Sequence, residues 1–182
     1  MNEITSVNKH GQGRSCFITR RALFSASHRY WLPELSDHDN SKSFGKCAIA
    51  PGHGHNYELI VSMQGELNKN GMVLNLSDVK HAIKEKVTSP LDFHFINETW
   101  PEFDLSTSKG CLATTEALSK VIWERLECHL PLISLRLYEE PSLWADYLGN
   151  KMEAYLTIKK HFAAAHRLAR NELSQKENED IY

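Results

Sequence analysis

Two histidines separated by one residue, His53 and His55, are the side chains best suited to chemistry in this sequence. Residues two apart in an extended strand point to the same face, so both imidazoles can reach one metal ion. Gly54 between them leaves room on the opposite face. Such a pair alone is a weak signal, since two surface histidines can have the same spacing. A third nitrogen ligand strengthens it, and His28 on the preceding predicted strand is the candidate.

Three histidines with one open position are typical of catalytic zinc, whereas structural zinc sites are closed by four protein ligands. Cys47 lies six residues before His53, across a Pro-Gly loop, so a thiol is expected near this metal. A nearby cation would lower the pKa of the thiol and raise its thiolate fraction. The same position also suits a fourth zinc ligand or a small buried apolar residue.

Hydrophobic periodicity predicts the elements that must position these residues. The expected order is strand, strand, helix, helix, strand, strand, over residues 15–31, 53–67, 77–87, 114–126, 133–139 and 143–148. Residues 33–46 are expected to form a loop, and Pro90 to end the first helix. This order indicates an α+β fold with helices on one face of an antiparallel sheet.

Composition restricts the possible partners and the cellular compartment. Apolar residues make up 41% and charged residues 24% of the 182, which is enough apolar material for a globular core. The net charge of −2 gives no reason to expect a nucleic-acid or anionic-membrane partner. The N-terminal stretch has no apolar run, no segment is apolar enough to span a membrane, and the four cysteines form no CxxC pair. We therefore expect a cytoplasmic protein with reduced thiols.

One segment of the sequence recurs near its C-terminus. FSASHRYWLPELS at 24–36 matches FAAAHRLARNELS at 162–174 with an offset of 138 residues, which aligns His166 with His28. We expect a flexible arm at 1–14, one complete unit at 15–150 and the start of a second, truncated unit at 151–182. Residues 151–182 are expected to be poorly ordered or to pair with another chain, because they lack the rest of their unit. The alternative is a C-terminal amphipathic helix with chance similarity.

Several longer motifs give the sequence a specific resemblance. They are FSASHR, SFGKCAIAPGHGHNYEL, GMVLNLSDVK, SPLDFHFIN, TTEAL and LYEEPS. Their order and approximate spacing resemble those of the 6-pyruvoyltetrahydropterin synthase and 6-carboxytetrahydropterin synthase family, over about residues 17–148. The resemblance implies the tunnelling fold (T-fold), with a four-stranded antiparallel sheet and two helices on one face. It also implies a homo-oligomer, a dimer of trimers or its tandem-repeat equivalent, with active sites at subunit interfaces.

The resemblance further implies a set of site residues and a substrate, 7,8-dihydroneopterin triphosphate. His28, His53 and His55 would hold Zn²⁺, and the metal would bind the side-chain hydroxyls of that substrate. Cys47 would be the thiolate that moves protons, Glu139 would anchor the pterin, and Thr114 and Thr115 would help to seat the ring. From the residues alone, a solvated charge at a strand end is the favoured interpretation of Glu139, and helix capping is the simple interpretation of the two threonines.

One position departs from the family pattern of Leu-Asp-His, in which Asp and His assist the cysteine from a neighbouring subunit. This sequence has Leu91, Asp92, Phe93 and His94, so a phenylalanine occupies the histidine position. Phenylalanine cannot relay a proton, and His94 would point the opposite way in an extended segment. Either His94 substitutes for the missing histidine, or the second unit supplies one, or turnover by this unit is impaired.

The implied activity is a lyase reaction that converts dihydroneopterin triphosphate to a 6-substituted tetrahydropterin with loss of triphosphate. A 6-carboxytetrahydropterin product would lead to queuosine-type deazapurines, and a 6-pyruvoyltetrahydropterin product to biopterin-like cofactors. The residues do not decide between the two. One alternative is a degenerate unit that binds zinc and pterin or only builds the oligomer. A weaker one is a generic zinc hydrolase, which leaves the matches at Glu139, Thr114 and Thr115 unexplained.

Overall fold

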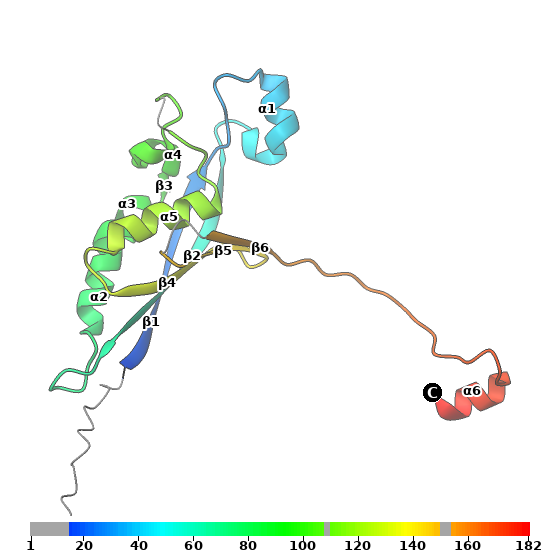
Figure 1. Ribbon diagram of the computed structural model, residues 1–182. Helices are drawn as coiled ribbons and strands as arrows, with labels where there is room; N and C mark the ends of the chain where they lie inside the picture. The colour runs from blue at the N-terminus through cyan, green and yellow to red at the C-terminus, as the bar shows by residue number, and fades with distance from the viewer. Residues whose placement is uncertain (1–14, 108–109, 150–153) are drawn as a thin grey trace, which may run out of the picture.

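A computed structural model describes residues 15–107, 110–149 and 154–182. It contains one mixed sheet with helices packed against one face, and the C-terminal part of the chain leads away from the sheet (Figure 1). The strand order is β3-β1-β2-β4-β5-β6. The strands are β1 (Ser15–His28), β2 (His53–Glu66), β3 (His94–Phe95), β4 (Leu132–Glu140), β5 (Leu143–Tyr147) and β6 (Ala154–Ile158). The arm expected at 1–14 lies outside the described residues.

The two helices that cover the sheet lie where apolar periodicity predicts them. Helix α2 (Leu76–Ile83) continues through a π-helical turn (Lys84–Thr88) into α3 (Ser89–Leu91), and α5 (Thr115–Leu126) crosses the same face (Figure 1). Their buried side chains share one core with the inward residues of β2 and β4, and the fully buried members include Leu59, Val61, Ile83, Leu118, Ile122, Leu135 and Leu137. The expected α+β fold with helices on one face is confirmed.

The central ladder joins β1 and β2, each 14 residues long, in an antiparallel pairing without interruption. Buried and exposed positions alternate along both strands, as expected for a sheet with one face on the core. The register places His28, the last residue of β1, opposite His53, the first residue of β2. The two strands therefore bring both histidines to one end of the sheet.

The sheet is wider than the four antiparallel strands expected from the sequence. β1, β2, β4 and β5 form that antiparallel core, but β3 adds a parallel pairing to Ala26 and Ser27 at one edge. At the other edge, β6 pairs antiparallel with β5 of the same chain. The expectation that residues 151–182 are poorly ordered or pair with another chain is therefore wrong for 154–158.

Local helix signals account for two further differences from the predicted elements. The predicted loop at 33–46 contains α1 (Asp37–Phe44), which begins where the Ser36 side chain accepts a hydrogen bond from the Asp39 amide, and a 3-10 turn (Gly45–Ala48) follows. Pro90 does not end the helical segment, because it lies in the first turn of α3, where its missing N–H costs no hydrogen bond.

The remaining helical segments are short. They are α4 (Ile96–Thr99), a 3-10 turn (Pro101–Phe103) and α6 (Gln175–Ile181), which follows an extended stretch that leads away from the sheet (Figure 1). Within the described ranges, no helix has the length and apolar character needed to cross a bilayer.

Gly52 shapes the approach of the chain to His53, and its substitution is the first test of the fold. Gly52 has a φ of +126°, and a Cβ there would lie 2.5 Å from the backbone oxygen of His28. Gly52→Ala is therefore expected to lower the free energy of unfolding by about 2 kcal/mol, through backbone strain and displacement of the end of β1.

Gly54 provides the matched control, because a Cβ there meets no atom closer than 3.6 Å, the backbone oxygen of Ala26. Thermal unfolding of both variants, in the presence of a chelator, measures the difference. Equal melting temperatures for Gly52→Ala and Gly54→Ala would contradict the role assigned to Gly52.

Candidate active site

A cluster of three histidines lies at the end of the β1–β2 ladder. His28, His53 and His55 each offer one ring nitrogen, and these three atoms lie within 4.8 Å of one another. The Nε2 atoms of His28 and His53 are 3.3 Å apart, and the His28 ring is fully buried. The structure therefore brings together the three residues that the sequence identifies as metal ligands.

The protonation state of His28 suits a metal ligand. Its Nδ1–H donates to the backbone oxygen of Ala113 over 3.0 Å, which leaves the lone pair of Nε2 directed at the cluster. Burial, and then the positive charge that His55 can carry, lowers the pKa of His28 to about 4. Burial also lowers the pKa of His53. Both rings are thus neutral at neutral pH, which is the form that binds metals.

The surroundings of His55 Nε2 support the fit of a cation. This buried atom makes no hydrogen bond within the described residues, although Glu139 Oε1 lies 3.4 Å away. Buried polar atoms are rarely left unpaired, because each costs about 1–3 kcal/mol. Three imidazoles suit Zn²⁺ as well as other first-row divalent metals. The cluster can therefore hold a metal ion, and its donor set is compatible with zinc.

Cys47 lies beside the cluster on the 3-10 turn between α1 and β2. Its Sγ atom is 3.9 Å from His53 Nε2. Burial, and then the negative charge of Glu139, raises the pKa of the Cys47 thiol. The sequence-based expectation of a lowered pKa therefore depends on a cation at the histidines, whose charge would oppose both effects.

Glu139 reaches the same cluster from β4. The residue is buried, with only 6% of its surface exposed, and Oε1 lies 3.4 Å from His55 Nε2. Oε2 accepts a hydrogen bond of 2.5 Å from the Thr115 hydroxyl. Burial raises the pKa of Glu139, partly offset by the bond from Thr115 and by His55. Thr114 instead caps α5, where its hydroxyl accepts a bond from the Ala117 amide.

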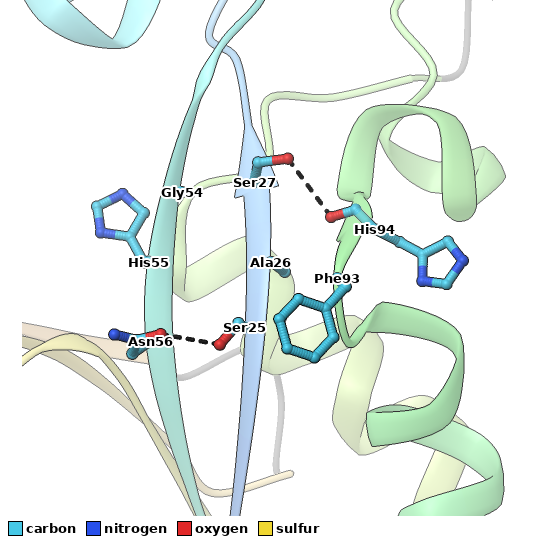
Figure 2. Close-up of a pocket in the computed structure, with 8 residues that line it drawn as sticks. All are labelled: Ser25, Ala26, Ser27, Gly54, His55, Asn56, Phe93 and His94. Carbon is cyan, nitrogen blue, oxygen red and sulfur yellow. Dashed lines mark hydrogen bonds between the residues drawn. The ribbon is translucent and has the colours of Figure 1, made fainter.

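Asp92, Phe93 and His94 lie at the outer edge of β1, and Figure 2 shows the last two. Asp92 Oδ1 accepts a bond from the Ser25 amide over 2.8 Å, and the Phe93 amide donates to the Ser25 oxygen over 2.6 Å. Phe93 has a φ of 60° and is 86% exposed. In Figure 2 strands β1 and β2 run between the rings of His55 and Phe93.

His94 is exposed as well, and its Nδ1–H donates to the backbone oxygen of Asp92 over 2.7 Å. Figure 2 shows its ring directed away from the rings of His55 and Phe93. Of the residues predicted for the site, Cys47, Thr115 and Glu139 thus lie at the histidines of the same chain, whereas Asp92 and His94 do not.

Two tyrosines at the site were not identified from the sequence. The Tyr57 hydroxyl lies 3.4 Å from His28 Nδ1, and the Tyr30 ring centroid is 4.8 Å from that of His28. Burial, and then Glu139, raises the pKa of both phenols. Tyr57 could have been found, because it continues the alternation that puts His53 and His55 on one face of β2. Tyr30 could have been found in the same way, because it lies two residues after His28 in the strand predicted over 15–31.

The pKa of His28 predicts a pH dependence of the metal-free protein. Because the folded pKa of about 4 lies below the ordinary value of 6.5, the folded state binds fewer protons between these pH values. The resulting stability is fully present above pH ~6.5 and is lost as the pH falls toward ~4, by up to ~3 kcal/mol.

Urea unfolding between pH 7 and pH 4.5, with a chelator present, tests this prediction. His28→Gln should flatten the dependence, whereas the control His81→Gln, at a side chain that is 78% exposed, should not. Parallel curves for the unaltered protein and His28→Gln would exclude His28 as the cause.

Comparison with known proteins extends the resemblance. The protein family described as 6-pyruvoyl tetrahydropterin synthase matches residues 17–150. The 6-pyruvoyl tetrahydrobiopterin synthase of Homo sapiens is 38% identical over 149 residues, which cover 79% of this chain and 99% of the human protein. The 6-carboxy-5,6,7,8-tetrahydropterin synthase of Haemophilus influenzae is 31% identical over 148 residues, covering 71% and 96%.

A solved structure agrees with these matches. The 6-pyruvoyl tetrahydropterin synthase of Caenorhabditis elegans superposes with a TM-score of 0.67 and 29% identity, covering 76% of this chain and 98% of that one. The tunnelling fold and the expectation of a lyase of pterin biosynthesis are confirmed at this level. The chain belongs to the 6-pyruvoyl tetrahydropterin synthase family.

Proposed function

We propose that this protein is a zinc-dependent lyase that converts 7,8-dihydroneopterin triphosphate to a 6-substituted tetrahydropterin with loss of triphosphate. The observation that carries the proposal is the histidine cluster, built on buried His28, with a thiol and a carboxyl group beside it. A zinc hydrolase would need the three histidines and a water molecule, but not a cysteine and a buried glutamate at the same place.

Each side chain has a role that follows from its contacts. Zn²⁺ held by His28, His53 and His55 would act as a Lewis acid on the side-chain hydroxyls of the substrate. Cys47, whose thiol lies 3.9 Å from His53, would take up and return the proton of a neighbouring C–H or O–H group. This role requires the thiolate, which the charge of the cation would favour.

Glu139 would recognise the pterin. The pterin edge presents an exocyclic amine beside a ring N–H, and a carboxylate can accept both bonds. Thr115 holds one carboxyl oxygen at 2.5 Å and thereby fixes the orientation of the group. Two N–H donors would stabilise the ionised carboxylate and so oppose the effect of burial, which raises the pKa of Glu139.

The identity of the product is the second part of the proposal. The relatives with the higher identity carry the name 6-pyruvoyl tetrahydrobiopterin synthase, at 38% for Homo sapiens, against 31% for the carboxy-forming enzyme of Haemophilus influenzae. We therefore rank 6-pyruvoyltetrahydropterin above 6-carboxytetrahydropterin. The two products differ in mass, so one measurement decides between them.

A degenerate, non-catalytic unit is the second candidate function, and Phe93 is the observation that favours it. Phe93 occupies the position of the family histidine, and its exposed ring offers no proton. Such a unit would keep the histidine cluster and Glu139 for binding zinc and pterin, or serve only to build the oligomer. It would bind zinc without forming product.

Anaerobic turnover of 7,8-dihydroneopterin triphosphate by the zinc-loaded protein, with products identified by mass, tests the main proposal. Cys47→Ala is expected to lower kcat by ~10²-fold or more, because it removes the acid–base group, while the zinc content stays the same. Cys128→Ala, at an exposed thiol, is the control and should leave kcat unchanged. Zinc binding without product in the unaltered protein would favour the degenerate unit.

Phe93→His tests the consequence of the departure from the family pattern. An added imidazole is expected to raise kcat by ~10-fold with little change in KM, because it would restore a proton-transfer group to the site of a neighbouring subunit, as the resemblance implies, without changing substrate contacts. Histidine also tolerates a positive φ better than phenylalanine does. Phe17 is also an exposed phenylalanine and lies on β1, so Phe17→His controls for a histidine added elsewhere on the surface. An unchanged kcat would exclude Phe93 as the limit on turnover.

A further inference from the structure

A cavity beside helix α2 is lined by four side chains of the types that bind metals. It lies between α2 and the turn that joins α5 to β4, and its volume is about 430 Å³. The four residues are Asp78, His81, Glu85 and His129. The turn meets the sheet where the Gln64 amide donates to the Pro131 oxygen, and Gln64 pairs with Phe17 near the start of β1. The cavity therefore lies toward the end of the β1–β2 ladder that is opposite His28.

His81 and Glu85 are spaced like two ligands of one ion. They lie four residues apart on one face of the helical segment, and His81 Nε2 is 3.4 Å from Glu85 Oε2. That separation is longer than an ordinary N–H···O hydrogen bond, which measures about 2.7–3.2 Å. Two atoms that bind a tetrahedral Zn²⁺ ion, each at about 2.0–2.1 Å, lie about 3.3 Å apart. Both atoms can therefore bind one ion with little movement of either side chain.

The carboxyl group of Glu85 is in the form that binds a cation. The hydrogen bond and the charge of Lys86 lower the pKa of Glu85, and charge on the two histidines of the cavity adds to this effect. Glu85 is therefore ionised at neutral pH, as a metal ligand must be. Lys86 binds only one of the carboxyl oxygens, Oε1, at 2.8 Å, so Oε2 stays directed at His81.

His129 offers a third ligand from the facing turn. Its backbone N–H donates to the Leu126 oxygen over 2.9 Å, while its exposed side chain lines the same cavity as Glu85. In the described ranges, only the histidines of the candidate active site form a group of three whose ligand atoms already lie within 4.8 Å of one another. The His129 ring must therefore rotate to join the pair, and exposed side chains change rotamer within nanoseconds.

The charges around the cavity favour a cation. Asp78, one helical turn before His81, adds a second carboxylate, against the single ammonium group of Lys86. The other two lysines of this helical segment, Lys80 and Lys84, line a different cavity beside β1. Asp78 is also placed to fill a coordination position that would otherwise take a water molecule.

We propose that His81, Glu85 and His129 form a second metal site, for a divalent first-row ion such as Zn²⁺, separate from the histidine cluster of the candidate active site. Two imidazoles and one carboxylate are a donor set that zinc accepts, with a fourth position left for water or Asp78. An ion bound there joins α2 to the turn before β4 and so stabilises the packing of the helix on the sheet. The site is independent of the proposed lyase activity.

Chemical modification tests the proposal on the unaltered chain. Diethyl pyrocarbonate acylates an imidazole nitrogen that has a free lone pair, and a neutral imidazole bound to a metal has none left. With excess Zn²⁺, acylation of His81 and His129, mapped by peptide mass, should fall at least ~5-fold, because both rings must be bound through their lone pairs. Acylation of His38, an exposed histidine on α1, should not change.

Glu85→Gln distinguishes a shared site from histidines that bind zinc separately. Calorimetric titration with Zn²⁺ is made on a His53→Gln chain, in which the active-site cluster lacks one ligand. We expect one ion to bind, and Glu85→Gln to raise its Kd at least ~10-fold, since loss of a ligand costs no less than loss of a group that orients one. Glu124→Gln is the matched control, because Glu124 is also exposed and pairs with Lys120 four residues away.

Three results would overturn the proposal. Equal acylation of His81 with and without Zn²⁺ would mean that no ion binds the pair. Protection of His38 to the same extent would mean that zinc binds exposed histidines without selection. Equal Kd values for Glu85→Gln and Glu124→Gln would exclude the carboxylate of Glu85 as a ligand. None of these measurements involves turnover, so a failure here is distinct from a failure of the proposed lyase activity.

Discussion

The antiparallel pairing of β1 with β2 is the constraint on which the candidate site depends. Its register brings the last residue of one strand, His28, opposite the first residue of the other, His53. A slip of one residue would turn His53 and His55 to the helix-free face, because the side-chain period of a strand is two. Cys47 approaches the histidines from the adjoining turn, and Glu139 approaches them from β4. The pairing of β1 with β2 thus positions the histidines that both residues approach.

Burial gives this cluster its electrostatic character. Burial lowers the pKa values of His28 and His53 and raises those of Cys47 and Glu139. Each of these shifts is toward the uncharged form of the group, because removing a charge from water costs free energy. A cation would change this balance, since it favours ionised thiol and carboxyl groups nearby. Burial therefore links the protonation of Cys47 and Glu139 to the binding of a metal ion.

The features that sequence reasoning predicted well are local. The alternation His53-Gly54-His55 and the apolar stripes of α2 and α5 each lie within one element, so spacing alone indicates which side chains share a face. The contact of Glu139 with Thr115 joins β4 to α5 and was not predicted, although the family resemblance implied that both residues lie at the substrate. The Ala113 carbonyl was missed for the same reason, because its proximity to His28 depends on how distant segments pack.

The elements that were predicted wrongly lack an apolar pattern. Helix α1 has the polar sequence DHDNSKSF and is held by the cap at Ser36 and by buried Asn40 rather than by an apolar stripe. β3 has only two residues, His94 and Phe95, and exists because Asp92 and Phe93 bind the backbone of β1 at Ser25. The positive φ of Phe93 belongs to this attachment, and no sequence rule assigns such a backbone to phenylalanine.

The short connection between β5 and β6 has a consequence for the kinetics of association. β5 ends at Tyr147 and β6 begins at Ala154 of the same chain, so β6 meets the β5 edge at an effective concentration of roughly millimolar. A strand from another molecule at micromolar concentration encounters that edge about a thousandfold less often. Occupation of the edge is therefore decided mainly by the length of this connection. A longer connection between β5 and β6 would lower this effective concentration and so favour pairing with another molecule. No contact within the sheet would change.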